Sequence, residues 1–292
     1  MKKQFKTVID TVAITSDINN FDDFTKVNNE RFDCIDRIRD NFDNSNMTLK
    51  LNLHTKYGEM NIDTYKKHKQ GIVETMEQIG VISIDQVKLN RIDIALDSSD
   101  YDYQEDFKKM LFTYELLTIK HKKSSKWYTT DLNTLKTNTI KLYDSRFELE
   151  IYDKKSESNG VHPSNIRIEF RYKRLSKDLS NSIDYINKVS DKIKEMDKHL
   201  ETLEINMSNR LIMLYESEKD NVKSFSEFVR KYSHYFYTVN ILKKVYKSVG
   251  LKGNCKGWID DFRKRNTLEF YTTKDIKKIQ KAMLRSIKTY VK

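Results

Sequence analysis

Charged and tyrosine side chains alternate with aliphatic or aromatic residues in four short segments of this sequence. The segments cover residues 88–97, 138–143, 147–154 and 165–173. Alternate side chains of a β-strand point to opposite faces, so each segment predicts a strand with one apolar and one charged face. The charged faces carry Arg91, Asp93, Asp97, Lys141, Tyr143, Glu148, Glu150, Tyr152, Lys154, Arg167, Glu169, Arg171 and Lys173. If the four strands share one sheet, these side chains meet on one open surface.

Such a surface has the groups needed to cleave a nucleic-acid strand. Carboxylates on adjacent strands are oxygen ligands of the kind that bind Mg²⁺ or Mn²⁺. A bound ion withdraws charge from a phosphodiester, and Arg or Lys stabilises the negative charge that develops. Tyrosine is a covalent nucleophile once its phenol loses a proton, which nearby cations favour. The face therefore fits cleavage through a phosphotyrosine; the alternative is a solvated sheet face held together by cross-strand ion pairs.

Other catalytic classes lack their motifs. The histidines are scattered, with no His-x-His, no His-Glu-x-x-His and no cysteine pair, which argues against a zinc site. Neither a Gly-x-x-x-x-Gly-Lys-Ser/Thr loop nor a Gly-x-Gly-x-x-Gly turn is present, which disfavours nucleotide-driven motors and dinucleotide enzymes. A serine nucleophile elbow is also missing from the sequence.

Four pieces of the sequence resemble a known family. They are NRIDIALD at 90–97, IKLYDSR at 140–146, EIYDKKSE at 150–157 and IRIEFR at 166–171. In this order and spacing they are similar to the core of plasmid rolling-circle replication initiators, of the trans-acting Rep type of Gram-positive plasmids, and to related relaxases of conjugative elements. The resemblance covers about residues 85–175.

The resemblance implies a specific chemistry. In that family a tyrosine nicks one origin strand and stays joined to the 5′ phosphate, which leaves a 3′ hydroxyl as primer. Carried over, it places the nucleophile at Tyr143. It further assigns Asp93, Asp97 and Glu169 as ligands of Mg²⁺ or Mn²⁺, and Arg146, Lys154 and Arg167 to the surroundings of the phosphate.

The sequence departs from the family pattern at the nucleophile. That pattern resembles Tyr-Ile-Gly-Ser-Arg, and an ungapped match puts Leu142 in the place of the tyrosine and Asp144 in that of the glycine. Tyr143 is thus one position late, and one position changes the face of a strand unless a bulge re-aims it. Tyr152 is therefore a second candidate for the nucleophile.

The strands and helices expected from the sequence make up an α+β fold. It has an antiparallel-rich sheet with one open polar face and helices on the other, followed by a helical C-terminal region. Further strands are expected at residues 7–15, 47–54, 60–65 and 126–130, the second and third as a hairpin. Helices are expected at residues 65–79, 103–119, 224–249 and 273–291, together with a long helix after residue 175.

The segment after residue 175 has its own character. Apolar residues from Leu179 to Leu203 recur at steps of three and four, close to a heptad seam, which suits either a homodimer or packing on the helix's own domain. Residues 241–292 hold 15 Lys and Arg against 4 Asp and Glu, a net charge of +11. This equals the net charge of the whole chain, so the first 240 residues are neutral overall. We therefore predict a nicking domain over 1–175 and a basic DNA-binding or dimerisation region over 176–292. A lysine-rich composition bias is the alternative explanation of the charge.

The length, composition and cysteine content limit the class of protein and the compartment. The 292 residues suffice for a core, and no run reaches the ~18 apolar residues that a membrane span needs. Cys34 and Cys255 form neither a metal pair nor a disulfide framework, so a reducing cytoplasm is expected. The expected partners are duplex and single-stranded origin DNA and, by the resemblance, a host helicase.

Together these features predict an initiator that nicks and rejoins one origin strand to start rolling-circle replication. Two alternatives stay open. One is a DNA-binding initiator or regulator without enzymatic activity, in which the charged sheet face is structural. The other is a relaxase for conjugative transfer, which uses the same chemistry.

Overall fold

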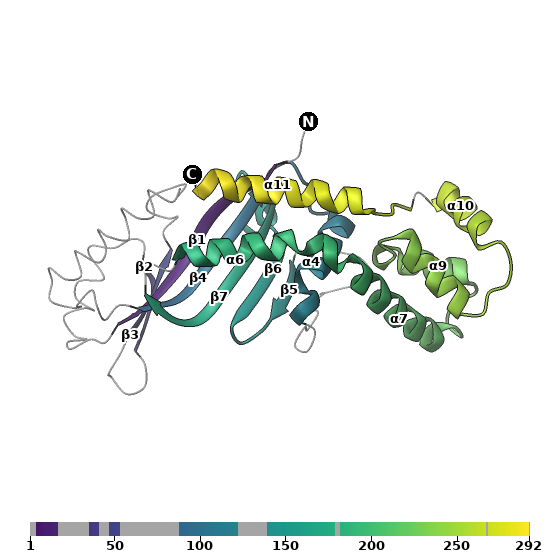
Figure 1. Cartoon of the computed structure of the whole chain (residues 1–292), viewed down its shortest axis with the longest axis horizontal. Helices are drawn as coiled ribbons and strands as arrows, with labels where there is room; N and C mark the ends of the chain where they lie inside the picture. Colours follow the sequence, from purple (N-terminus) through teal and green to yellow (C-terminus); the bar gives the residue numbers. More distant parts are fainter. Residues whose placement is uncertain are drawn as a thin grey trace.

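A seven-stranded antiparallel sheet in the order β2-β3-β1-β4-β7-β6-β5 forms the centre of the protein (Figure 1). The computed structural model describes residues 4–16, 35–40, 47–52, 88–121, 139–178, 182–266 and 268–291. The strands are β1 (Lys6–Ser16), β2 (Ile35–Asp40), β3 (Met47–Asn52), β4 (Lys88–Ser98), β5 (Thr139–Tyr143), β6 (Phe147–Asp153) and β7 (Ile166–Asp178). The predicted α+β fold with an antiparallel-rich sheet is confirmed.

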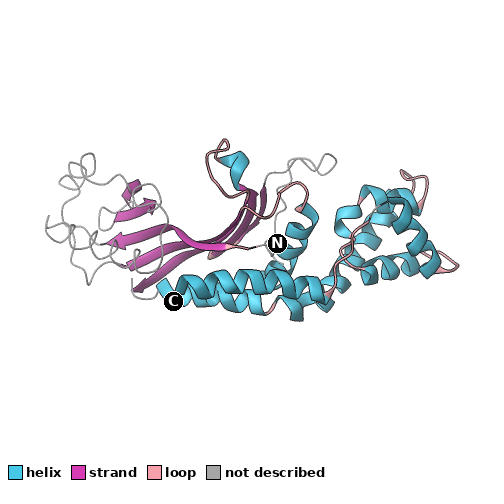
Figure 2. Cartoon of the chain, turned by 90° about the horizontal axis from the view of Figure 1, so that it is seen from above, coloured by secondary structure: helices cyan, strands magenta, loops and turns pink. Residues whose placement is uncertain are grey.

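The two faces of the sheet differ as the alternation predicts. Ile92, Ile94 and Leu96 of β4 have no exposed surface and lie on the face that the helices cover. Helices α4 (Phe107–Thr118), α6 (Ser182–Lys194) and α11 (Thr273–Val291) pack on that face. Figure 2 shows the helices along one side of the sheet, while among the described residues only the short α5 (Lys154–Glu157) rises on the other. No other described element covers the polar face, which we call the open face.

Helix α11 has the bounds that the sequence predicts. Its apolar residues Ile276, Ile279, Met283 and Ile287 follow helical spacing and are buried against the sheet and α6. Asp275 accepts the backbone N–H of Thr272 at 3.0 Å, which satisfies a donor that the helix start leaves open. Helix α4 also forms where a helix is expected but begins at Phe107.

The predicted helix over 224–249 is divided. The structure has α8 (Phe225–Lys231), the 3₁₀ turn η5 (Ser233–Tyr235) and α9 (Val239–Ser248). Phe236 and Tyr237 between them are fully buried, and Thr238 caps α9 by accepting the N–H of Ile241. Both aromatic side chains are buried in the core at the break, so tertiary packing overrides the helical spacing of the sequence here.

The heptad-like stripe of the long predicted helix is buried within the chain itself. It passes through α6, the 3₁₀ turn η4 (Met196–His199) and α7 (Leu200–Glu218). Ile186, Val189, Ile193 and Met196 have no exposed surface. Gln280 of α11 donates to the carbonyl of Ile193 at 2.9 Å, where α6 ends. The stripe thus packs on its own sheet and is not available as a dimer seam.

Helices α7, α8, α9 and α10 (Cys255–Asn266) form the end of the molecule farthest from β2 and β3 (Figure 1). Their interior is aromatic: Trp258 packs against Phe225 and Tyr246 with ring centroids 5.3 Å apart in both pairs. Helices α6 and α11 lie after residue 175 but pack on the sheet of the first part of the chain. The division of the chain at residue 175 stays a prediction. None of the described helices is long and apolar enough to cross a membrane.

Several expected elements lie outside the described residues, namely the strands at 60–65 and 126–130 and the helix at 65–79. The strand expected at 47–54 is β3, which pairs with β1 and with β2, a strand that the sequence analysis does not predict.

A buried histidine makes the stability of the helical end depend on pH. Burial, and then the charge of Lys108, lower the pKa of His234 to about 4. The unfolded chain therefore binds a proton between about pH 6.5 and pH 4 that the folded chain rejects, so stability is lost as the pH falls through this range. We expect the free energy of unfolding in urea to drop by about 1–2 kcal/mol more in the native chain than in His234→Gln between about pH 7 and pH 5. Equal losses in the two chains would contradict this role.

Candidate active site on the open face of the sheet

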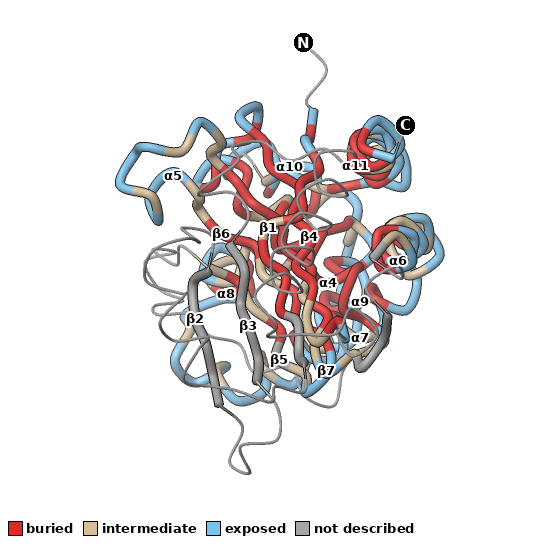
Figure 3. The backbone as a smooth tube through the Cα atoms, turned by 90° about the vertical axis from the view of Figure 1, so that its left-hand side faces the viewer, coloured by how far each residue is buried: buried red, intermediate tan, exposed pale blue. Residues whose placement is uncertain are grey.

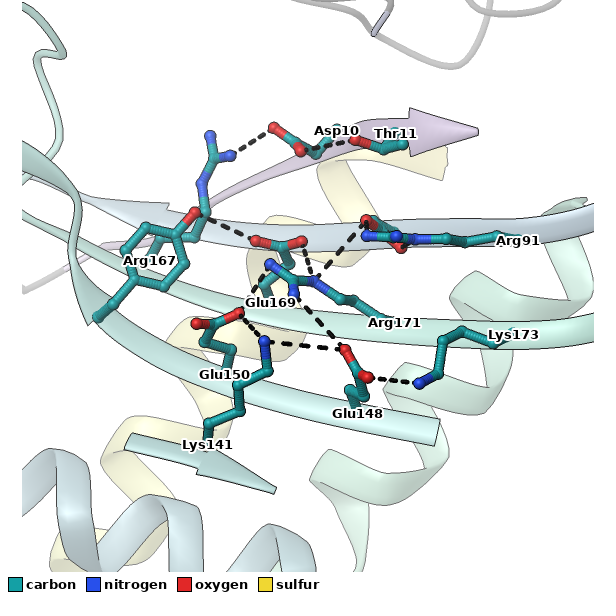
Figure 4. A network of polar contacts seen from close by, with 12 residues as sticks. Asp10, Thr11, Arg91, Lys141, Glu148, Glu150, Arg167, Glu169, Arg171 and Lys173 are labelled. Atoms are coloured by element: carbon teal, nitrogen blue, oxygen red, sulfur yellow. Dashed lines mark hydrogen bonds and ion pairs between the residues drawn. The ribbon is translucent and has the colours of Figure 1, made fainter. Parts of the chain in front are cut away.

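The strand register aligns the predicted polar residues in rows across the open face. One row holds Asp97, Arg167 and Tyr152, the next Glu169, Glu150 and Lys141, and the third Asp93, Arg171, Glu148 and Tyr143. The side chains from β4, β7, β6 and β5 thus meet on one surface, as the alternation predicts. Figure 4 shows Glu169, Glu150, Glu148 and Arg171 directed toward one another.

Three carboxylates from three strands form a cluster on this face. Asp10 of β1, Asp93 of β4 and Glu169 of β7 each offer an oxygen, and these oxygens lie within 4.8 Å of one another. Asp93 and Glu169 are buried and Asp10 is half-buried. The structure therefore brings together two of the carboxylates expected to bind a metal and places a third carboxylate, Asp10, beside them.

A β-bulge places Asp10 in the cluster. Ile9 pairs with Ile94 and Thr11 with Asp93, so Asp10 is an extra residue between two regular pairs of β1 and β4. A bulge bends a strand and redirects the side chain of the extra residue. The only signal in the sequence is an acidic residue inside an otherwise apolar strand, and the alternation rule does not identify it as part of a site.

Asp97 has a different partner from the one expected of a metal ligand. Arg167 holds it with two hydrogen bonds, from Nε to Oδ1 at 2.7 Å and from Nη2 to Oδ2 at 2.8 Å. The same guanidinium reaches Asp10 through Nη1. Asp97 thus stands outside the cluster of Asp10, Asp93 and Glu169, and Arg167 links the two.

Arg167 is buried, with only 2% of its surface exposed. Burial lowers its pKa, but the hydrogen bonds and charge of Asp97 and the charge of Asp10 outweigh this and raise the pKa above its usual value. The side chain therefore stays charged and forms ion pairs with Asp97 and Asp10 within the sheet. The resemblance instead places it beside a phosphate.

Removing this guanidinium leaves two carboxylates without their partner. We expect Arg167→Met to lower the free energy of unfolding in urea by about 3–5 kcal/mol, the usual cost of breaking a buried ion pair on one side. The double variant Arg167→Met, Asp97→Asn serves as control and regains part of this loss, since it removes the stranded charge as well. A loss below about 1 kcal/mol in the single variant would show that water replaces the guanidinium.

The electrostatics of the cluster favour added positive charge. Burial raises the pKa of Asp93 to about 7, and the charge of Glu169 adds to the rise, although the hydrogen bond from Arg91 opposes it. Arg91 donates from Nε to Oδ1 of Asp93 at 2.8 Å, and Arg171 donates from Nε to Oε1 of Glu169 at 2.6 Å. The carboxylates are crowded enough that two guanidinium groups do not return Asp93 to its usual pKa.

The two candidate nucleophiles occupy different environments. Tyr152 is buried and donates its phenolic hydrogen to Oε2 of Glu169 at 3.1 Å, and burial together with the charge of Glu169 raises its pKa. Tyr143 ends the edge strand β5 and pairs with Glu148, so its backbone register puts it on the open face; its side chain lies outside the described set. Leu142 has no exposed surface and faces the helices. The register thus assigns position 143, and not position 142, to the row of Glu148 and Arg171.

Arg146 and Lys154 stand apart. Arg146 is exposed in the turn before β6, and Lys154 follows the last residue of β6, where it pairs with Glu157 at 2.6 Å. A strand of 7 residues separates their positions by about 23 Å. The structure therefore does not bring these two cations to one phosphate, although Lys154 lies over the ring of Tyr152, 5.6 Å from its centre.

The rest of the face is a network of ion pairs. Arg171 contacts Glu150 at 2.7 Å, Lys141 contacts Glu150 at 3.3 Å, and Lys173 pairs with Glu148. Cross-strand pairs of this kind stabilise a sheet whether or not it has a catalytic role. Chemically, the face combines a carboxylate cluster, fixed guanidinium groups and a tyrosine at its edge.

No family model matches the sequence, and no curated protein matches it. Among solved structures the chain is similar to the structure of the rolling circle replication initiator protein from Geobacillus stearothermophilus. The sequences are 12% identical, the match covers 58% of this chain and 74% of the other, and the TM-score is 0.31. A likeness at this TM-score carries no argument about function, which has to rest on the residues of the open face.

Proposed function

We propose that this protein is a metal-dependent nicking and joining enzyme that cleaves one DNA strand through a phosphotyrosine and thereby starts rolling-circle replication. The observation that carries the proposal is the carboxylate cluster of Asp10, Asp93 and Glu169 on an open sheet face, with a tyrosine at the end of the edge strand. Three hard oxygen donors suit Mg²⁺ or Mn²⁺ and not softer metals. Bound there, the ion would polarise the scissile phosphate.

Residues of the open face supply the nucleophile, the proton acceptor and the positive charge beside the phosphate. The phenolic oxygen of Tyr143 forms a bond to phosphorus, the bond from phosphorus to the 3′ oxygen breaks, and that oxygen leaves as a 3′ hydroxyl after taking a proton. Glu148 pairs with Tyr143 in the register and is the carboxylate proposed to accept the phenolic proton. Arg171, fixed by Glu169 and Glu150, holds positive charge on the face where the phosphate carries negative charge.

One observation favours the alternative of a DNA-binding initiator or regulator without enzymatic activity. The carboxylates of the face already have basic partners: Asp93 has Arg91, Glu169 has Arg171, and Asp10 has Arg167. A face neutralised in this way can be a purely structural ion-pair network. The two functions differ in whether a covalent bond to DNA forms.

The deciding experiment detects that bond. The full chain is incubated with a pool of random-sequence single-stranded oligonucleotides and Mn²⁺, and adducts are separated on a denaturing gel and mapped by mass spectrometry. We expect an adduct on the peptide that contains Tyr143, and none after chelation of the metal. Retained DNA binding without any adduct would establish the binding-only alternative.

A nick of this kind can serve replication or conjugative transfer, because a relaxase would use the same residues. The genes beside this one distinguish the two, since transfer requires a mating apparatus. A host helicase and a second copy of the chain remain proposed partners of the initiator, to be tested by pull-down and by light scattering of the purified chain.

A further inference from the structure

The outward side of α11 carries a row of basic side chains. The exposed cations are Lys274, Lys277, Lys278, Lys281, Arg285 and Lys288, and the helix contains a single acidic residue, Asp275. The positions 274, 278, 281, 285 and 288 follow steps of four and three, so these five side chains form one stripe along the helix. We call them the α11 stripe. At about 1.5 Å per residue it is about 21 Å long.

The α11 stripe has fewer acidic partners than the basic residues of α6 and α7. On α6, Lys194 pairs with Asp191 at 2.8 Å; Arg210 of α7 pairs with Glu115 at 3.8 Å, and Lys219 just after α7 pairs with Glu216 at 3.0 Å. Within the part of the chain that the structure describes, Lys278 is the only member of the α11 stripe with an ion pair, to Asp275 at 3.6 Å. Four of the five stripe cations therefore present charge to solvent that no acidic side chain of the described residues neutralises.

The packing of α11 holds the stripe toward solvent. Ile276, Met283 and Ile287 on its inner side are buried, and Ser286 shares a hydrogen bond of 2.9 Å with Thr7 of β1. Viewed along the molecule (Figure 3), α11 and α6 lie on one side of the sheet and α5 on the other, and the outer side of α11 is exposed. The stripe is therefore on the opposite side of the sheet from the carboxylate cluster.

We propose that the α11 stripe binds the phosphate backbone of duplex DNA, at a surface separate from the site of cleavage. Phosphates of one strand repeat every ~3.4 Å along the helix axis, so the stripe spans about six base pairs. Binding through lysines and one arginine releases counterions and reads no sequence. A duplex held behind the sheet leaves the open face clear for a single strand. The inference rests on the proposed function in taking DNA, and not another polyanion, as the partner.

Deletion of the C-terminal region is unsuitable as a test, because it would remove the buried side of α11 from the core. The test instead neutralises the stripe with Lys274→Gln, Lys278→Gln, Lys281→Gln, Arg285→Gln and Lys288→Gln in one variant. A matched control changes the same number of exposed cations on α7, α8 and the loop between them: Arg210, Lys219, Lys223, Arg230 and Lys231, each to Gln. Near-UV circular dichroism checks that both variants fold.

The measurement is the affinity for a random-sequence duplex at several salt concentrations, by fluorescence anisotropy. We expect the stripe variant to bind at least tenfold more weakly. Its log–log salt slope should be shallower by about 0.9 for each phosphate that it no longer neutralises, so by about 3–5 in all. The control should keep the slope of the native chain to within about 1. In the native chain, duplex DNA should protect the stripe lysines from acetylation, a result that needs no variant.

Equal slopes in the two variants, or stripe lysines acetylated as fast with DNA as without it, would overturn the inference. So would a stripe variant that loses binding to phosphatidylserine vesicles while its duplex affinity is unchanged, since the partner would then be a membrane surface. Adduct formation on single strands is followed in parallel. A native chain that makes no adduct, yet differs from the stripe variant in duplex binding, refutes the proposed function and leaves this inference standing.

Discussion

A chain with Tyr143→Phe binds single-stranded DNA as the native chain does but forms no covalent adduct with it. The substitution removes one oxygen and almost no volume, so the edge strand β5 should keep its pairing with β6. Without the attacking oxygen, adduct formation falls at least about 1,000-fold, because Tyr152, the other tyrosine of the face, is buried and has a raised pKa. The measurement is the rate at which labelled DNA becomes protein-bound on a denaturing gel.

Tyr152→Phe is the matched control. Its phenol donates to Glu169 at 3.1 Å in a buried setting that raises its pKa, so formation of a phenolate there is disfavoured. We expect this variant to form the adduct about 10- to 100-fold more slowly, since Glu169 loses a group that orients it. If Tyr152→Phe abolishes the adduct and Tyr143→Phe does not, the nucleophile lies on β6.

The metal site gives the second large effect. Asp10→Asn, Asp93→Asn and Glu169→Gln should each weaken Mn²⁺ binding at least about 100-fold, because each removes the charge of a proposed ligand. Asp97→Asn is the control: it disturbs the pair with Arg167 and lowers stability, but it should leave Mn²⁺ affinity within about tenfold. Binding is read from the rise in Tm with added Mn²⁺, and cleavage is measured alongside.

Two outcomes would contradict this site. Equal loss of Mn²⁺ binding in all four variants would mean that the whole ion-pair network, and not a ligand set, determines the result. Unchanged Mn²⁺ binding in the Asp10 variant would return the site to the set Asp93, Asp97 and Glu169 that the family resemblance implies.

The metal effect should also depend on pH through Asp93. Because burial raises the pKa of Asp93 to about 7, the folded chain holds a proton there that the unfolded chain has released above about pH 4. In the absence of metal this contribution to stability is present at low pH and is lost as the pH rises through 7. A divalent ion needs the carboxylate, so the rise in Tm with Mn²⁺ should be larger at about pH 8 than at about pH 6. In Asp93→Asn this difference should disappear.

The periodicity of the chain predicts the fold and most of the candidate face. Strict alternation assigns Asp93, Glu148, Glu169 and Arg171 to one side of the sheet, and the register places them there. Helix α11 has the bounds that the sequence predicts, and strand β6 ends one residue before its predicted end. These predictions succeed because an element with one apolar side has to bury it, so its pattern specifies both its type and its orientation.

The tertiary structure decides which of these polar residues form a site. A bulge in β1 brings Asp10 to Asp93 and Glu169, and the guanidinium of Arg167 takes Asp97 out of the expected ligand set. The bulge depends on how β1 pairs with β4, and the choice of partner for Arg167 depends on distances across three strands. Alternation describes single strands and contains neither quantity. The same reason applies to the apolar stripe of α6 and α7, whose spacing fits a dimer seam equally well. In the folded chain the sheet and α11 cover its α6 part, and α4 and α9 pack on α7.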